Sequence, residues 1–154
     1  MIRTEYLLSI LHCFFLIIKQ INPSRRNQMT ERSPHPDRLP NCENAEIPQD
    51  KLERYCLNPD HVSTPYGRSS GRDKARVFKA ALGFDQSTWE VLRDRILSEL
   101  PYHEASLGAA DEFGQRYTVT LPITGVNGNT ANVLVAWIVR LGTDYPSLVS
   151  TYVT

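Results

Sequence analysis

The chain has 154 residues, of which 41% are hydrophobic and 22% are charged, and this suits one globular domain with its own core. It has 17 basic and 17 acidic residues, so the formal net charge is zero. Residues 1–39 hold six basic and three acidic residues, and residues 40–154 therefore carry a net charge of −3. This slightly acidic part argues against a general nucleic-acid-binding protein, which would normally be basic.

Residues 1–39 are predicted to form an apolar segment and a flexible linker. The apolar run at residues 7–18 is shorter than the roughly 20 residues that span a membrane, and a polar, proline-bearing stretch follows it. Three interpretations stay open: Met29 is the true start of a cytoplasmic protein, residues 1–21 export or anchor the chain, or the run packs as a helix. The first is favoured. Contact with a membrane is expected only if residues 7–18 are translated and act as an anchor.

Three helices are predicted in the first half of the remaining chain, over residues 47–58, 71–84 and 85–100. In each of them apolar side chains recur at helical spacing. The third helix is the best specified, because Ser87 and Glu90 have the spacing of a capping box.

After the helices the apolar spacing changes to two, which is typical of strands. Strands are predicted over residues 103–110, 115–123, 130–142 and 145–154. Asn127-Gly128 is a residue pair that tight hairpin turns prefer, and it separates the second strand from the third. The sequence therefore predicts an α+β fold for a single domain at residues 40–154, with about three N-terminal helices followed by a four-stranded antiparallel sheet.

The connection between the first two helices carries the strongest chemical signals. His61 could act as a general base or acid near neutral pH. Arg68, Arg72 and Lys74 place cations around Gly71 at the start of a helix, where unpaired backbone N–H groups favour a phosphate or carboxylate. The simpler alternatives are a loop histidine bonded to nearby backbone and a solvated helix face. The phosphate-binding pattern G-x-x-x-x-G-K-[ST] is absent.

The last predicted strand contributes hydroxyl groups. Ser150, Thr151 and Tyr152 are consecutive, so their side chains alternate between the two faces of a strand. Strand propensity alone would also explain these residue types.

No metal or cofactor is expected. The three cysteines, Cys13, Cys42 and Cys56, form no C-x-x-C pair and have no histidine at a zinc-ligand spacing. An odd number of cysteines at scattered positions is typical of a cytoplasmic protein, in which the thiols stay reduced.

Several separated blocks resemble a family of small bacterial domains of unknown function. These blocks are "LPNCENAEIPQDKLERYCLNPDH", "GRDKARVFKAALGF" and "TGVNGNTANVLVAWIV" followed by "YPSLVSTYV". They cover residues 39–154 in order. The chain departs from the family pattern at Cys56, where leucine is usual, and at Val62, where proline usually follows the histidine.

The order of the predicted elements is similar to that of small ribonuclease toxins of the barnase, colicin and RelE kind. That likeness implies His61 as acid or base, Lys74 and Arg72 as phosphate-binding cations, and Thr151 or Tyr152 as positioning groups. It is an analogy at the level of the fold.

Three functions follow from these observations. The favoured one is a non-catalytic interaction or accessory module, with a protein partner in a toxin–antitoxin type of locus. The first alternative is a metal-independent ribonuclease toxin with His61, Lys74 and Thr151 as catalytic residues. The second is a binder of a phosphate-bearing or other anionic ligand at residues 67–74. All three require residues 59–74 to fold back over the last strand.

Overall fold

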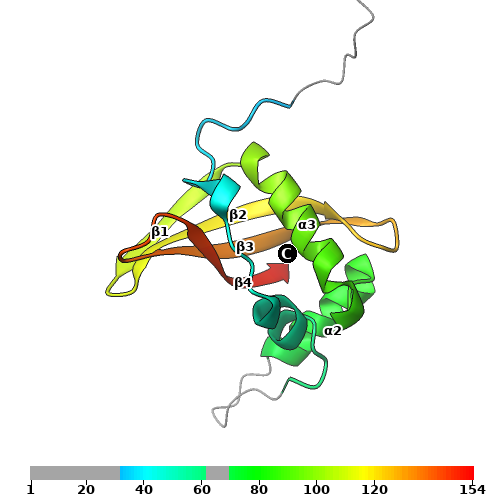
Figure 1. Cartoon of the computed structure of the whole chain (residues 1–154). Coiled ribbons are helices and arrows are strands. Elements are labelled where there is room, and N and C mark those ends of the chain that lie inside the picture. Colours follow the sequence, from blue (N-terminus) through cyan, green and yellow to red (C-terminus); the bar gives the residue numbers. More distant parts are fainter. Residues whose placement is uncertain (1–31, 62–69) are drawn as a thin grey trace, which may run out of the picture. The chain divides into compact units, whose positions relative to one another are not determined.

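The computed structural model describes residues 32–61 and 70–154, and for residues 70–72 the backbone alone. Residues 33–154 form one compact unit. Its helical elements are η2 (Cys42–Asn44), η3 (Asp50–Cys56), α2 (Ser70–Leu82), η4 (Gln86–Thr88), α3 (Trp89–Glu99) and η5 (Leu100–Tyr102). Its strands are β1 (Ala105–Asp111), β2 (Gly114–Thr124), β3 (Thr130–Arg140) and β4 (Pro146–Val153) (Figure 1).

The four strands form one antiparallel sheet in the order β1-β2-β3-β4, so neighbours in sequence are also neighbours in space. The α+β class and the four-stranded antiparallel sheet predicted from the sequence are therefore confirmed. The number of helices before the sheet stays a prediction, since residues 1–31 lie outside the described residues. The apolar run at residues 7–18 and Met29 lie outside them as well. In the described part of the chain, no helix has both the length and the apolar character needed to cross a membrane.

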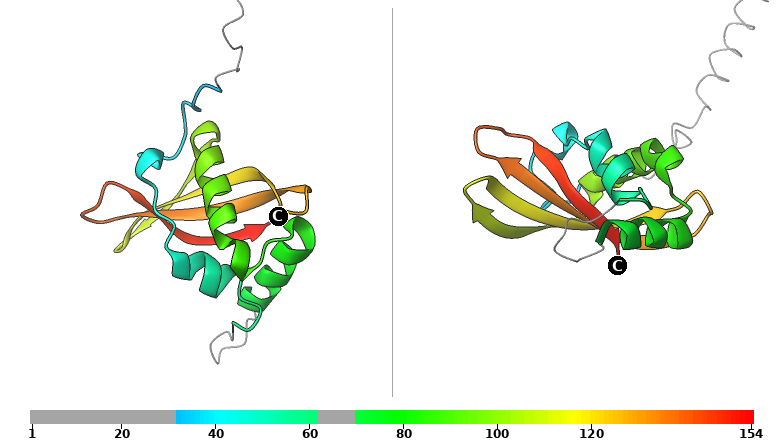
Figure 2. Two further views of the ribbon diagram at one scale, coloured as in Figure 1. Left: turned by 45° about the vertical axis from the view of Figure 1, so that its right-hand side comes forward. Right: turned by 90° about the horizontal axis from the view of Figure 1, so that it is seen from below.

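The helices bury their apolar stripes against the sheet. α3 packs on β2, whereas η3 and α2 pack on β4 at the edge of the sheet (Figures 1 and 2). Phe78 and Leu82 of α2 are buried at the spacing that the sequence predicts. The sheet contributes to the same core the buried residues Val119, Leu121, Ile123, Val133, Val135, Trp137 and Leu148.

The segment η3 differs from the α-helix predicted over residues 47–58. It is a π-helix, in which the N–H of Leu57 donates to the carbonyl oxygen of Leu52, five residues earlier, at 2.8 Å. Leu52 and Cys56 of η3 are both completely buried. The helix ends before Asn58-Pro59, as the restriction on the residue before a proline predicts.

The capping box predicted at Ser87 and Glu90 is wrong, because the cap is Asp85. The backbone of Asp85 is extended (φ −141°), and a short 3₁₀ turn precedes α3. One carboxylate oxygen of Asp85 accepts from the N–H of Ser87 at 3.0 Å, and the hydroxyl of Thr88 accepts from the N–H of Asp85 at 2.9 Å. This is a reciprocal capping box shifted two residues toward the N-terminus.

A β-bulge in β4 decides which of its side chains are exposed. Ala136 of β3 pairs with Ser150, but the next residue, Trp137, pairs with Leu148, so Val149 is the additional residue. Leu148 and Thr151 both face the core as a result. Ser150 and Tyr152, on either side of Thr151, lie on the opposite face of the sheet.

The capping carboxylate gives the fold a testable pH dependence. Hydrogen bonds from Lys79 and Ser87 lower the pKa of Asp85 from 3.8 to about 2. Its contribution to stability is therefore complete above about pH 4 and is lost as the pH falls toward 2. Replacing Asp85→Asn keeps a capping oxygen and removes the charge. We expect lower stability than wild type at pH 7 and a difference that shrinks between pH 4 and 2. Urea unfolding of both proteins across this pH range measures the difference in stability. A difference that stays constant down to pH 2 would contradict a stabilising role of the Asp85 charge.

Candidate functional site

Lys74 is the centre of a cluster where α2 meets β4. Its ammonium nitrogen Nζ donates a hydrogen bond to Oγ of Ser150 at 2.7 Å, although the two residues are 76 positions apart. Both side chains are half-buried. With Tyr55 and Tyr152, whose rings lie beside the ammonium group, and His61, which contacts Tyr55, these residues form what we call the Lys74 cluster.

Two aromatic rings lie beside the ammonium group. The Nζ atom of Lys74 is 5.1 Å from the ring centre of Tyr55 and 5.8 Å from that of Tyr152. At such distances the negative face of an aromatic ring attracts a cation. The rings therefore attract the ammonium group of Lys74.

His61 joins the cluster through Tyr55. The rings of the two residues meet edge to face, with centres 4.8 Å apart and planes at 73°. A turn places the histidine there: the side chain of Asn58 accepts from the N–H of Asp60, and the carbonyl of Asn58 accepts from the N–H of His61. His61 and Lys74 thus contact the same ring of Tyr55.

The charge of Lys74 is not neutralised by a described carboxylate. Ion pairs between other cations and carboxylates are Arg54–Asp50, Arg76–Asp73, Lys79–Asp85, Arg93–Asp94 and Arg116–Asp111. Among the residues that the structure describes, Lys74 has a hydroxyl and two neutral rings as neighbours instead. The cluster can therefore attract an anion.

Thr151 does not share this surface. Its side chain is fully buried, and its hydroxyl donates to the carbonyl oxygen of Leu134 at 3.1 Å. Its backbone N–H also bonds to the sulfur of Cys56. The residue beside it, Ser150, provides the hydroxyl that contacts Lys74. The sequence pattern does not distinguish Ser150 from its neighbours, because the bulge that exposes it leaves no simple sequence signal.

The structure describes only some of the other predicted site residues. Tyr152 is 41% exposed and lies in the cluster with His61 and Lys74. Gly71 and Arg72 belong to the first turn of α2, where the backbone alone is described. Arg68 lies outside the described residues. The anion-binding loop predicted at residues 67–74 stays a prediction.

The buried thiols are poor nucleophiles. Cys42 and Cys56 are free cysteines, and in both of them burial is the main cause that raises the pKa above its ordinary value of 9.0. Over residues 32–61 and 70–154, no group of three or more His, Cys, Asp or Glu side chains could hold a metal ion.

Comparison with known proteins gives one match. Residues 38–154 match the model of a family described as a domain of unknown function (DUF6883). The chain belongs to this family. The resemblance that its sequence blocks indicate is thereby confirmed. No curated protein and no solved structure matches the chain significantly. The likeness to ribonuclease toxins stays a prediction.

The opposite orientations of Ser150 and Thr151 can be tested with two variants. Ser150→Ala removes the acceptor of the Lys74 ammonium group, so we expect faster acylation of Lys74 by an amine-reactive ester, measured by mass spectrometry. Thr151→Val removes a buried hydrogen bond, and we expect a loss of about 1 kcal/mol in unfolding free energy with unchanged Lys74 reactivity. Equal effects of the two variants on Lys74 would show that Thr151 also faces the cluster.

Proposed function

We propose that the domain is a non-catalytic interaction module that binds an oxyanion of a partner protein at the Lys74 cluster. The observation that carries the proposal is the half-buried residue Lys74, whose ammonium group is held by Ser150 and two aromatic rings without a described carboxylate. Such a cation lowers its free energy when an anion approaches.

The cluster offers several donors to one oxyanion. An ammonium group has three N–H donors, and Ser150 accepts one of those of Lys74. Because the oxygen of Ser150 acts as acceptor, its own O–H remains a donor. The hydroxyl of the exposed Tyr152 adds another. A carboxylate or phosphate group accepts several hydrogen bonds and suits this arrangement.

The environment of Lys74 argues against catalysis by Ser150. For Lys74 to activate the serine as a nucleophile it would have to be a neutral base. In the structure its Nζ atom donates a hydrogen bond to the serine hydroxyl instead. Lys74 therefore suits binding better than proton abstraction.

The charge of the domain favours a protein partner over RNA. Residues 40–154 carry a balance of −3, which repels a polyanion more than it repels a single side-chain oxyanion. The free thiols Cys42 and Cys56 support a cytoplasmic location, where cysteines stay reduced. In this proposal the domain acts as the accessory partner of another protein, for example in a toxin–antitoxin locus.

A charge-removing variant tests the proposal, with inorganic phosphate as the probe. Lys74→Met keeps the length of the side chain between the rings and removes the ammonium group. We expect phosphate to shift the amide resonances of Ser150 and Tyr152 in an NMR titration at constant ionic strength. Affinity should fall about fivefold or more in Lys74→Met, since a charge-assisted hydrogen bond is lost.

The matched control is Lys51→Met, which removes an exposed ammonium group from η3. It should bind phosphate as the wild type does. Binding by Lys74→Met at wild-type affinity would refute an anion site at the cluster.

A metal-independent ribonuclease is the second candidate, and one observation favours it: His61 and Lys74 contact the same ring of Tyr55. A histidine and a cation close together are the groups that phosphodiester cleavage needs. The buried position of Thr151 removes one of the expected positioning hydroxyls from that surface.

RNA cleavage separates the two candidates. We expect the purified domain to leave a fluorescent RNA intact, at the same background rate as the double variant His61→Ala, Lys74→Met. Cleavage by the wild type that the double variant lacks would establish the ribonuclease and end the non-catalytic proposal.

A further inference from the structure

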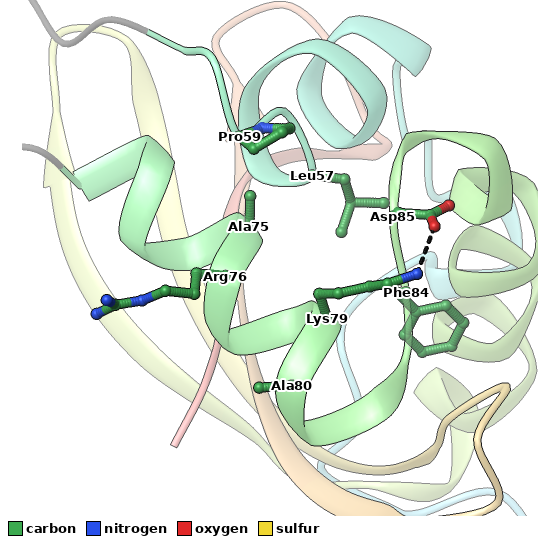
Figure 3. Close-up of a pocket in the computed structure, with 8 residues that line it drawn as sticks. All are labelled: Leu57, Pro59, Ala75, Arg76, Lys79, Ala80, Phe84 and Asp85. Carbon is green, nitrogen blue, oxygen red and sulfur yellow. Dashed lines mark hydrogen bonds and ion pairs between the residues drawn. The ribbon is translucent and has the colours of Figure 1, made fainter.

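A pocket lies against α2, on a different side of the helix from Lys74. It has a volume of about 590 Å³, which is within the range of small-molecule sites. It is lined by Leu57, Pro59, Ala75, Arg76, Lys79, Ala80, Phe84 and Asp85 (Figure 3). These residues come from α2, from the end of η3 with the turn that follows it, and from the segment before η4.

The floor of the pocket is apolar and already packed. Leu57 and Phe84 belong to the main core and are 1% and 0% exposed, and Ala75 is 5% exposed. Pro59 and the methyl group of Ala80 extend the apolar lining toward the surface. An apolar ligand would bury its surface against side chains that are held in place by the core, so little ordering is needed on binding.

Charged groups lie at the rim. Figure 3 shows Lys79 extending from α2 to Asp85, and their charged atoms are 2.7 Å apart. Arg76 points away from the pocket, and its guanidinium group pairs with Asp73 on its own helix at 3.7 Å. The side chains of Lys79 and Arg76 are 61% and 79% exposed, so these ion pairs are weak and can exchange partners.

The two charged groups at the mouth of the pocket differ in what they can offer a ligand. The carboxylate of Asp85 accepts hydrogen bonds from Ser87, Thr88 and Lys79, so both of its oxygens are occupied. An ammonium group has three N–H donors, and Asp85 accepts one of those of Lys79. A ligand anion can accept another of these donors, whereas a ligand cation would have to displace Lys79 from Asp85, and an uncharged ligand would gain only from its apolar surface.

The geometry points to a binding site for a small amphipathic monoanion, whose apolar body fills the pocket and whose carboxylate lies beside Lys79 at its rim. The site is separate from the Lys74 cluster. Residues 75, 76, 79 and 80 follow one side of the helix, because successive residues turn by about 100°, and Lys74 lies on the other side of the stripe that Phe78 and Leu82 bury.

Octanoate, 1-octanol and octylamine test the inference, because they share an apolar chain and differ in the charge of the head group at pH 7. We expect calorimetric titration to rank octanoate above octanol and octanol above octylammonium. Lys79→Met should weaken octanoate about threefold, to the affinity of octanol, and leave octanol unchanged, as the loss of an exposed charge pair implies.

A variant that fills the pocket tests its location. Ala80 is exposed, so Ala80→Phe can fold and place a ring in the space that the ligand needs. We expect octanoate and octanol to lose about tenfold or more in affinity, or about 1.4 kcal/mol. The matched control is Val77→Phe, on an exposed part of the same helix outside the lining residues, which should bind both as the wild type does.

Three outcomes would overturn the inference. They are absence of octanoate binding to the folded wild type, wild-type affinity of Ala80→Phe, and octylammonium binding as tightly as octanoate. The Lys74→Met variant should bind octanoate normally. This result distinguishes the pocket from the Lys74 cluster, so either site can fail without the other.

Discussion

The bulge at Val149 is the constraint on which the surface chemistry of this domain depends. In a regular strand that starts with Leu148 in the core, Ser150 would also face the core and Thr151 would face outward. The additional residue reverses this assignment, so Thr151 is buried and bonds to the carbonyl of Leu134. Ser150 is thereby freed to meet Lys74. One inserted residue thus determines which hydroxyl belongs to the core and which belongs to a site.

Lys74 reaches that hydroxyl because the core fixes α2 beside the edge strand. Phe78, one helical turn after Lys74, is fully buried, and burying such a side chain is favourable by roughly 1.5–3 kcal/mol. The same core holds Cys56 at the end of η3, and its sulfur bonds to the backbone of Thr151. Tyr55 precedes Cys56 directly. The position of the cluster therefore follows from packing on both flanking elements, and its members need no strong attraction of their own.

The sequence predicts the elements well because their apolar spacing is local. The helix expected over residues 71–84 is found at Ser70–Leu82, and the strand expected over 115–123 is found at Gly114–Thr124. Features that depend on a choice between hydrogen-bond partners are missed: the π-helical turns of η3, the cap at Asp85 and the bulge in β4. Each of these shifts a bond by one or two residues and leaves the apolar spacing almost unchanged.

The candidate site is predicted less completely for a related reason. Lys74, His61 and Tyr152 could be named from their chemistry, but their meeting depends on contacts between distant parts of the chain. Tyr55 lies within the helix predicted over residues 47–58, and its spacing there indicates only a packing role. In the structure it is half-buried, and its ring contacts both the histidine and the lysine. A residue at the edge of a core can serve packing and a surface site together, and its spacing in the sequence reveals only the first role.

The two lysines of α2 show how the environment of a charge determines its use. The ammonium group of Lys79 meets the carboxylate of Asp85, so the pair has little net charge and contributes mainly to the shape and selectivity of the pocket mouth. Lys74 is held by neutral groups, which keep the ammonium in place, and no carboxylate in the described part of the chain pairs with it. An anion at Lys74 would therefore bind chiefly through charge, and its affinity would weaken with salt. A ligand of the pocket would bind chiefly through apolar surface, and added salt would affect it much less.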